Sequence, residues 1–251
     1  MQEPDAAIGA IRTPERGFSP LSALLSGRAL PAAAARIGIA LARRRGRPWR
    51  VGTYVIAARH ADVAEALRRD LDFIIAPVNA AKIDAVNGPF VLGMDRSDRL
   101  ERERRALYAA LHRVDLGTIA GRTAARAAGR LEVSGGRFDA IADYARPVAA
   151  ATAMDLFGVA PADGALFAEV ARAIFAHTFL NLGNDEAVEA RALAAASLLG
   201  GWLKAEIAAR RARSDPGEDF MGALLAGGEL DDDGVRRTLG GMLVGSIDTT
   251  V

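Results

Sequence analysis

An acid and a hydroxyl, Asp248 and Thr249, stand side by side near the end of this 251-residue sequence. In a helix they would share one stripe with Gly241 and Gly245, because residues at i, i+4, i+7 and i+8 lie on the same face. Each glycine in a helix interior costs roughly 0.8–1 kcal/mol relative to alanine. Such a stripe lets a flat or bulky group approach the backbone, where a carboxylate and a hydroxyl one turn beyond would face it. Close helix–helix packing beside a polar helix end explains the same stripe equally well.

The stretch from 231 to 251 has the pattern of one long helix. The aspartates at 231–233 supply an N-cap and place negative charge at the positive end of the helix dipole. Apolar residues recur at helical spacing and mark the face that packs against protein. These residues are Leu239, Met242, Leu243 and Ile247.

Composition limits the class of protein. Hydrophobic residues make up 51% and charged residues 25% of the chain, which indicates a folded protein. The net charge of +1 gives no support to a nucleic-acid partner. Residues 1–11 lack the apolar centre of a secretory signal, and no apolar run approaches the roughly 20 residues that span a bilayer. We therefore expect a cytoplasmic protein with no membrane partner.

The order of expected elements is mainly helical. Residues 1–20 are expected to be a loosely ordered lead-in, residues 50–57 one β-strand, and residues 71–90 mostly loop, because proline and glycine interrupt them. The expected helices cover residues 31–42, 61–69, 96–112, 117–131, 148–157, 162–177, 186–212 and 220–225, followed by the long helix. The predicted fold class is mainly α with a small N-terminal β element.

The run Gly245-Ser246-Ile247-Asp248-Thr249-Thr250 resembles the oxygen-activating segment of the cytochrome P450 family, the haem-thiolate monooxygenases. That family has small-Gly-x-acid-Thr-Thr/Ser on a long central helix that crosses the face of the haem (heme). Ser246 stands where glycine is more usual.

Two further segments agree with the resemblance. They are the residues 144–161, with Tyr-Ala-Arg-Pro-Val and Leu-Phe-Gly-Val-Ala-Pro, and the Pro-Gly-Glu-Asp-Phe at 216–220. The likeness runs in the correct order from residue 50 to residue 251. Near residue 50, a strand or hairpin leading into the helix at 61–69 resembles the family's small N-terminal sheet and second helix. Intact family members are longer and hold the haem iron with a cysteine, whereas this sequence has none. The resemblance therefore implies a single incomplete domain over 1–251, the N-terminal part of the P450 fold, from either a cut sequence or a truncated gene.

The resemblance assigns roles to named positions. Asp248 would be a proton source, Thr249 would hold a water by a hydrogen bond, and Gly245 would leave space for the haem plane and dioxygen. In the family motif Met-Asp-x-Pro-x-x-His-x-x-x-Arg-Arg, Arg104 matches the arginine that binds a haem propionate, and Leu100 occupies the histidine position. Without that context, residues 99–105 read as a solvent-facing helix with i,i+4 ion pairs.

Apolar side chains supply the expected substrate contacts. In the family, the loop that matches 71–90 roofs the substrate pocket. The two helices that match 162–177 and 186–212, together with the loop at 178–185, form a lid that opens for substrate. The residues expected to touch substrate are Phe90, Phe175, Phe179 and Ile247. Ordinary core packing explains apolar residues in the 71–90 loop equally well.

The function that this resemblance implies is a haem-dependent monooxygenase. The intact protein would use dioxygen (O2), a small apolar substrate and electrons from a redox partner such as ferredoxin or a flavoprotein reductase. A non-catalytic remnant, a helical interaction domain and a family member that rearranges hydroperoxides remain as alternatives. Alone, the 251 residues are expected to be inactive, to bind haem poorly, and to expose the glycine stripe and much of the long helix.

Overall fold

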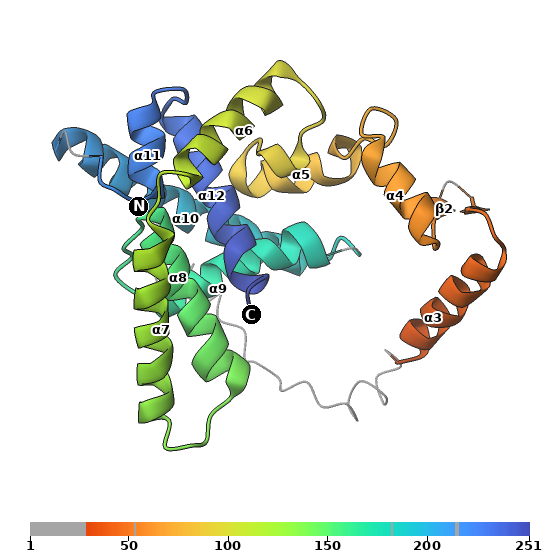
Figure 1. Ribbon diagram of the computed structural model, residues 1–251, viewed down its shortest axis with the longest axis horizontal. Helices are drawn as coiled ribbons and strands as arrows, with labels where there is room; N and C mark the ends of the chain where they lie inside the picture. Colours follow the sequence, from red (N-terminus) through yellow and green to blue (C-terminus); the bar gives the residue numbers. More distant parts are fainter. Residues whose placement is uncertain (1–28, 53, 182, 214–215) are drawn as a thin grey trace. The chain divides into compact units, whose positions relative to one another are not determined.

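The computed structural model describes residues 29–52, 54–181, 183–213 and 216–251 (Figure 1). The expected lead-in at 1–20 lies outside the described residues. The described chain forms two compact units, residues 29–74 and residues 75–251. The single domain expected over residues 1–251 stays a prediction.

The smaller unit contains a β-hairpin where the sequence predicts one strand. Residues 49–51 and 54–56 form two antiparallel strands, and Trp49 lies opposite Ile56. The single strand that the local pattern predicts at 50–57 is wrong, whereas the hairpin that the family resemblance also allowed is present. Gly52 adopts a φ of +60°, a left-handed conformation that reverses the chain at little cost for glycine. The elements of this unit are α3 (Ala29–Arg44), β1 (Trp49–Val51), β2 (Tyr54–Ile56) and α4 (His60–Arg68).

The larger unit is helical in its described residues. Its elements are α5 (Ala76–Asn87), the 3-10 turn η1 (Val91–Gly93), α6 (Asp98–Leu111), α7 (Leu116–Val133), the π-helical turn η2 (Ala140–Ala145), α8 (Arg146–Phe157), α9 (Gly164–Phe175), the π-helical turn η3 (Ala176–Leu180), α10 (Glu186–Arg213), α11 (Phe220–Gly227) and α12 (Asp232–Asp248). The predicted fold class, mainly α with a small β element, is confirmed.

Helix α5 lies inside the stretch that was expected to be mostly loop. Pro77 suits its first turn, where the missing N–H is not needed. The Asp95 carboxylate accepts hydrogen bonds from the backbone N–H groups of Ile75 and Ala76, at 2.8 and 3.0 Å. This cap comes from a residue about 20 positions away, so local sequence gives no sign of it. The expectation of loop at 76–87 is therefore wrong.

The predicted N-cap of the long helix is confirmed. The Asp231 carboxylate accepts a hydrogen bond of 2.7 Å from the Gly234 N–H. Ser97 caps α6 in the same way by accepting from the Leu100 N–H at 3.2 Å. Both caps satisfy backbone donors that have no partner inside the helix.

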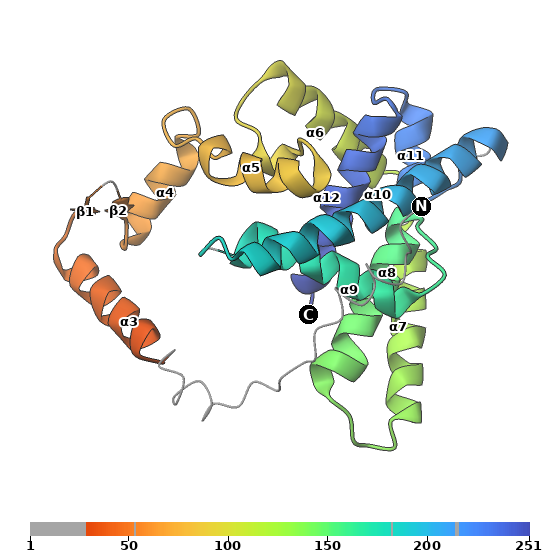
Figure 2. The ribbon, with the colours of Figure 1, turned by 180° about the vertical axis from the view of Figure 1, so that it is seen from behind.

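Helix α12 lies in the interior of the larger unit, with α8, α9 and α10 packed against it (Figure 1, Figure 2). The expectation that this chain would expose much of the long helix is wrong. Its buried residues are Gly234, Val235, Arg237, Thr238, Leu239, Gly240, Leu243, Val244 and Ile247. Other large side chains of the same core, each below 2% exposure, are Phe157, Phe167, Val170, Leu203, Phe220 and Met221.

Among the described residues, α10 is the one helix whose length and composition would allow it to cross a membrane. A core helix meets the same criteria, and α10 has a buried stripe at helical spacing. That stripe consists of Ala192, Ala195, Leu199, Leu203 and Ile207. The helix is therefore weak evidence for a membrane span.

Arg210 joins the two segments that carry the supporting sequence matches. Its guanidinium donates to both carboxylate oxygens of Asp219, at 2.6 and 2.8 Å, and to the carbonyl oxygens of Gly158 and Pro216, at 2.6 and 2.8 Å. The Arg210 side chain is 9% exposed. Gly158 has a φ of +70°, and a Cβ built on it would lie 2.2 Å from the Asp219 carboxylate. Only glycine fits there.

We predict that Asp219→Ala lowers the free energy of unfolding by about 2–3 kcal/mol, because it removes the bidentate partner of the buried Arg210 guanidinium, which keeps its bond to Glu206, and also removes the α11 cap. Urea unfolding measures the change. Asp232→Ala is the matched control. It removes the exposed Arg211–Asp232 pair and should cost under about 1 kcal/mol. Equal losses in the two variants would contradict the role given to Arg210.

Candidate functional site

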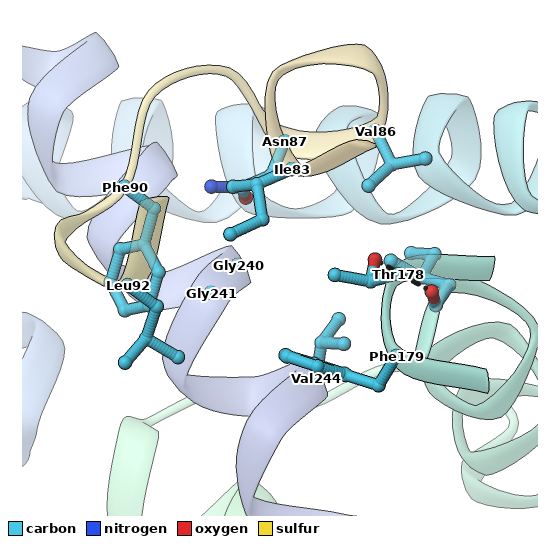
Figure 3. A pocket seen from close by; sticks show the side chains of 11 residues that line it. Ile83, Val86, Asn87, Phe90, Leu92, Thr178, Phe179, Gly240, Gly241 and Val244 are labelled. Atoms are coloured by element: carbon cyan, nitrogen blue, oxygen red, sulfur yellow. Dashed lines mark hydrogen bonds between the residues drawn. The ribbon is translucent and has the colours of Figure 1, made fainter. Parts of the chain in front are cut away.

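A small apolar pocket lies beside the middle of α12 (Figure 3). Phe90 and Leu92 lie on one side of it, Thr178 and Phe179 on the other, and the α12 backbone at 240–241 lies between them. Its volume of about 20 Å³ holds roughly one water molecule. The lining residues are Ile83, Val86, Asn87, Phe90, Leu92, Ile174, Thr178, Phe179, Gly240, Gly241 and Val244.

Gly241 makes room for the ring of Phe90. A Cβ built on Gly241 would lie 2.5 Å from the nearest ring carbon, closer than any real carbon contact. Gly240 is similar, because its Cβ would lie 2.3 Å from the side-chain oxygen of Asn87. This part of the glycine stripe therefore receives side chains of the same protein. The expectation that the whole stripe would be exposed is wrong at Gly241.

The four residues expected to touch substrate have different surroundings. Phe90 and Phe179 line the pocket. Phe175 lies against Phe179, with ring centroids 4.9 Å apart. Ile247 is fully buried in the hydrophobic core and is not among the lining residues. The structure thus brings the three phenylalanines into one region, whereas Ile247 is part of the core and does not line the pocket.

The polar side chains that line the pocket already have partners. The Asn87 amide donates to the carbonyl oxygens of Arg237 and Gly88, at 3.0 and 3.3 Å. The Thr178 hydroxyl donates to the Ile174 carbonyl oxygen at 2.9 Å. The pocket therefore suits an apolar group that needs no hydrogen bond.

The last turn of α12 holds the expected acid and hydroxyl. One oxygen of Asp248 accepts a hydrogen bond of 2.7 Å from Arg172 on α9. The other oxygen, Oδ2, is buried and has no partner among the described residues. The Thr249 hydroxyl donates to the Gly245 carbonyl oxygen at 2.5 Å. Apart from its own helix, no atom of the described residues lies within 4 Å of a Cβ built on Gly245. An open backbone face, a carboxylate oxygen and a hydroxyl therefore share one turn.

Helix α6 carries the two residues expected near a haem propionate. Arg104 is exposed, and its guanidinium has no hydrogen bond or ion pair to any residue in the described part of the chain. Leu100 is 6% exposed. Arg104 is thus free to bind an external carboxylate, whereas the position of the family's histidine holds a buried apolar side chain.

His177, on η3, is buried beside the pocket. Its Nδ1 lies 3.5 Å from the Asn181 side-chain amide. Burial lowers the pKa of His177, because removal from water disfavours the charged ring. The nearby Glu189 opposes this lowering and Lys82 adds to it.

Sequence reasoning missed the partners that come from distant elements. Arg172 lies 76 positions before the Asp248 that it pairs with, and Asn87 lies 150 positions before the Arg237 whose carbonyl it contacts. Nothing in either local pattern points to these contacts. The sequence did offer one indication of lining residues such as Val244. Helix α12 has apolar residues on more than one face, which indicates that a second face also contacts protein or ligand.

Comparison with known proteins identifies the fold. No family model and no curated protein sequence matches this chain. CalO2 aligns with a TM-score of 0.72 and 19% identity over 92% of this chain and 59% of its own. P450BioI, crystallised with an acyl carrier protein ligated to hexadec-9Z-enoic acid, aligns with a TM-score of 0.56 and 18% identity over 67% of this chain and 43% of its own. CYP105P1 aligns with a TM-score of 0.50 and 26% identity over 63% of this chain and 40% of its own.

These neighbours are cytochrome P450 structures. The chain therefore has the cytochrome P450 fold, over 59% of the length of CalO2 and less of the others.

We predict that Gly241→Ala lowers the free energy of unfolding by about 1–3 kcal/mol, because the new methyl group collides with the Phe90 ring. Gly245→Ala, which meets no atom, should raise stability by up to about 1 kcal/mol through helix propensity. In a Phe90→Ala background the cost of Gly241→Ala should disappear. Chemical denaturation of the four proteins measures these values. The same cost with and without the ring would refute the contact.

The lowered pKa of His177 predicts a loss of stability in acid. Below the ordinary histidine pKa of about 6.5, the unfolded chain binds more protons at this residue than the folded chain. The free energy of unfolding therefore falls as pH drops through 6.5 toward the lower folded pKa. His177→Asn should lose less stability than wild type between about pH 7.5 and about pH 5.5. His60→Asn, at an exposed position, should follow wild type. Parallel losses in all three proteins would exclude this linkage.

Proposed function

We propose that this chain forms the oxygen-activating side of a haem-dependent monooxygenase of the cytochrome P450 type that acts on a small apolar substrate. The last turn of α12 carries the proposal. It combines the open face of Gly245, the unpartnered oxygen of Asp248 and the hydroxyl of Thr249, within a P450 fold.

Two residues have the chemistry that a haem would need. Gly245 leaves its backbone accessible to a flat group, and the free guanidinium of Arg104 suits a propionate carboxylate. None of the 251 residues is cysteine, so a thiolate ligand would have to come from outside them. When bound, the haem supplies the iron that activates dioxygen.

The pair of Arg172 and Asp248 supports a proton path. Arg172 holds Oδ1, which fixes the orientation of the carboxylate and leaves Oδ2 for proton exchange. The Arg172 side chain is 52% exposed, whereas that of Asp248 is 8% exposed, so the pair extends from solvent to a buried oxygen. Asp248 would take a proton from the solvent side and release it at Oδ2, which is general-acid work.

Thr249 would hold the water that receives this proton. Because its O–H donates to the Gly245 carbonyl, the hydroxyl oxygen is left as an acceptor for a water O–H. That bond also fixes the rotamer of the hydroxyl. Asp248 and Thr249 are consecutive, so the carboxylate and the water would lie at the same end of α12.

The pocket supports an apolar substrate. Its phenylalanine and valine side chains offer contact area, and its polar groups are already bonded within the protein. A volume of about 20 Å³ is too small for an organic molecule, so a substrate would enter only when a wall moves. The η3 side, which corresponds to the family's lid, is the proposed moving wall. The chain would take its electrons from a ferredoxin or flavoprotein reductase.

Replacement of the hydroxyl tests the proposal in a protein that joins this chain to a cysteine-bearing haem part. Thr249→Ala should divert electrons into hydrogen peroxide, because the water that receives the proton is lost. Peroxide formed per NADPH consumed measures the diversion. Thr250→Ala is the matched control, because its hydroxyl donates to the Ser246 carbonyl oxygen at 2.6 Å in the same way. Unchanged coupling in Thr249→Ala would remove Thr249 from the mechanism.

A further inference from the structure

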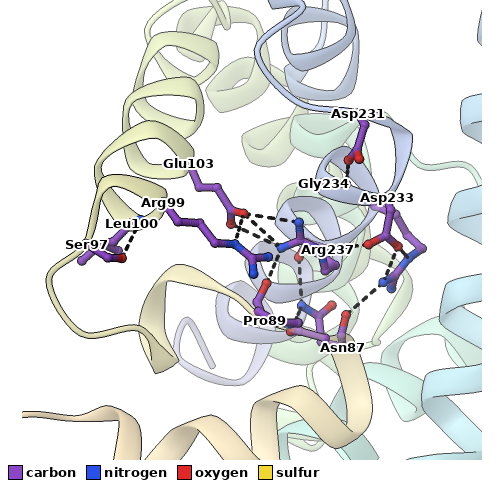
Figure 4. Close-up of polar contacts among 12 residues, drawn as sticks. Asn87, Pro89, Ser97, Arg99, Leu100, Glu103, Asp231, Asp233, Gly234 and Arg237 are labelled. Atoms are coloured by element: carbon purple, nitrogen blue, oxygen red, sulfur yellow. Dashed lines mark hydrogen bonds and ion pairs between the residues drawn. The ribbon is translucent and has the colours of Figure 1, made fainter.

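A polar cluster with a buried arginine at its centre lies near the N-terminal end of α12 (Figure 4). Arg237 is its centre, and we call it the Arg237 cluster, made up of Arg237, Glu103, Asp233 and Asn87. The side chains of Arg237 and Glu103 are 10% and 4% exposed. None of the three charged residues lines the pocket.

Arg237 contacts three different segments. Its guanidinium donates to the Glu103 carboxylate of α6 at 3.3 Å, to the Asp233 carboxylate of its own helix at 3.0 Å, and to the backbone carbonyl oxygen of Pro89. The planar fork of arginine can make these bonds at once, whereas a lysine ammonium cannot reproduce their geometry. Pro89 precedes Phe90, so Arg237 fixes the backbone immediately before the ring that lines the pocket.

The other end of the same short segment is also bonded to α12. The Asn87 amide donates to the Arg237 carbonyl oxygen at 3.0 Å, and Arg236 donates to the Asn87 carbonyl oxygen at 3.1 Å. Gly88 lies against the stem of Arg237, since a Cβ built on it would be 2.9 Å from the Arg237 Cδ. The segment 87–90 is thus held along its length by consecutive turns of one helix.

The position of the ring follows from these bonds. Arg237 and Gly241 are four residues apart, so they lie on one face of α12. Arg237 binds the Pro89 carbonyl oxygen and so fixes its position over this face. One turn further on, the Phe90 ring packs against Gly241. Glu103 is a counter-ion of the largely buried Arg237 guanidinium, which donates to the Pro89 carbonyl oxygen.

We infer that Arg237 is a positioning residue for the pocket. Together with Glu103 it holds the Phe90 ring against Gly241, and it thereby sets how large an apolar group the pocket admits, although it does not touch that group. This inference rests on the proposed function only in treating the pocket as a ligand site. The placement of the ring can be tested without haem, substrate or turnover.

The test places 4-fluorophenylalanine at position 90 of the full chain and follows its fluorine NMR resonance. Arg237→Lys keeps a charge beside Glu103 but loses the Pro89 contact, so the Phe90 resonance should move toward that of the free amino acid and broaden. A second reporter at the fully buried Phe157 should stay in place. Glu103→Gln should move the Phe90 resonance in the same direction.

Arg211→Lys is the matched control, since Arg211 on α10 forms an exposed ion pair with Asp232 on α12, and neither residue lines the pocket. It should leave both resonances unchanged. A Phe90 resonance that does not respond to Arg237→Lys would overturn the inference. Equal movement at 90 and 157 would also overturn it, because that result describes general loosening of the core.

Benzene serves as the probe for admission to the pocket. It should perturb the Phe90 resonance at lower concentration in Arg237→Lys than in wild type, because the displaced ring leaves an apolar space. The same concentration dependence in both proteins would refute control of admission by Arg237. The proposed monooxygenase function is tested separately, by the coupling of electron flow in Thr249→Ala.

Discussion

The close approach of Asn87 and Phe90 to the backbone of α12 is the constraint on which the rest of this structure depends. A helix that carried ordinary side chains at 240 and 241 would push away Asn87 and Phe90, which lie where those side chains would be. Because glycine removes the obstacle, the segment before α6 docks directly on the helix and closes one side of the pocket. Gly245 continues the same feature one turn later, but there no other part of the described chain occupies the space. The stripe thus has an occupied half and an open half.

Ion pairs connect the elements that pack around α12. Those that are largely buried have a different role from the one that is partly exposed. Arg210 with Asp219 and Arg237 with Glu103 are largely withdrawn from water, and each arginine also binds backbone carbonyl groups. Such pairs define where loops lie, since loss of the carboxylate leaves a largely buried arginine with fewer partners for its charge. Arg172 with Asp248 differs, because the arginine is half exposed and one carboxylate oxygen remains unused. That difference suits a group that exchanges protons rather than one that only supports the fold.

Long periodic segments were predictable, and elements that depend on distant partners were not. The long helix and its Asp231 cap follow from local pattern, as do helices such as α6 and α10. Helix α5 was missed because its N-terminus is capped by Asp95, and the hairpin was read as one strand because Gly52 turns the chain. In the candidate site, Phe90 and Phe179 were expected and do line the pocket, whereas Ile247 is buried in the core.

The sequence by itself determined that the chain is mainly helical, and that Gly245, Asp248 and Thr249 share the end of one helix, because helical periodicity is a local property. Only the tertiary structure decided which groups occupy the glycine stripe, which arginine pairs with Asp248, and which walls enclose the pocket. These outcomes depend on contacts between residues 76–150 positions apart. Burial and packing select such contacts, and no local pattern encodes them.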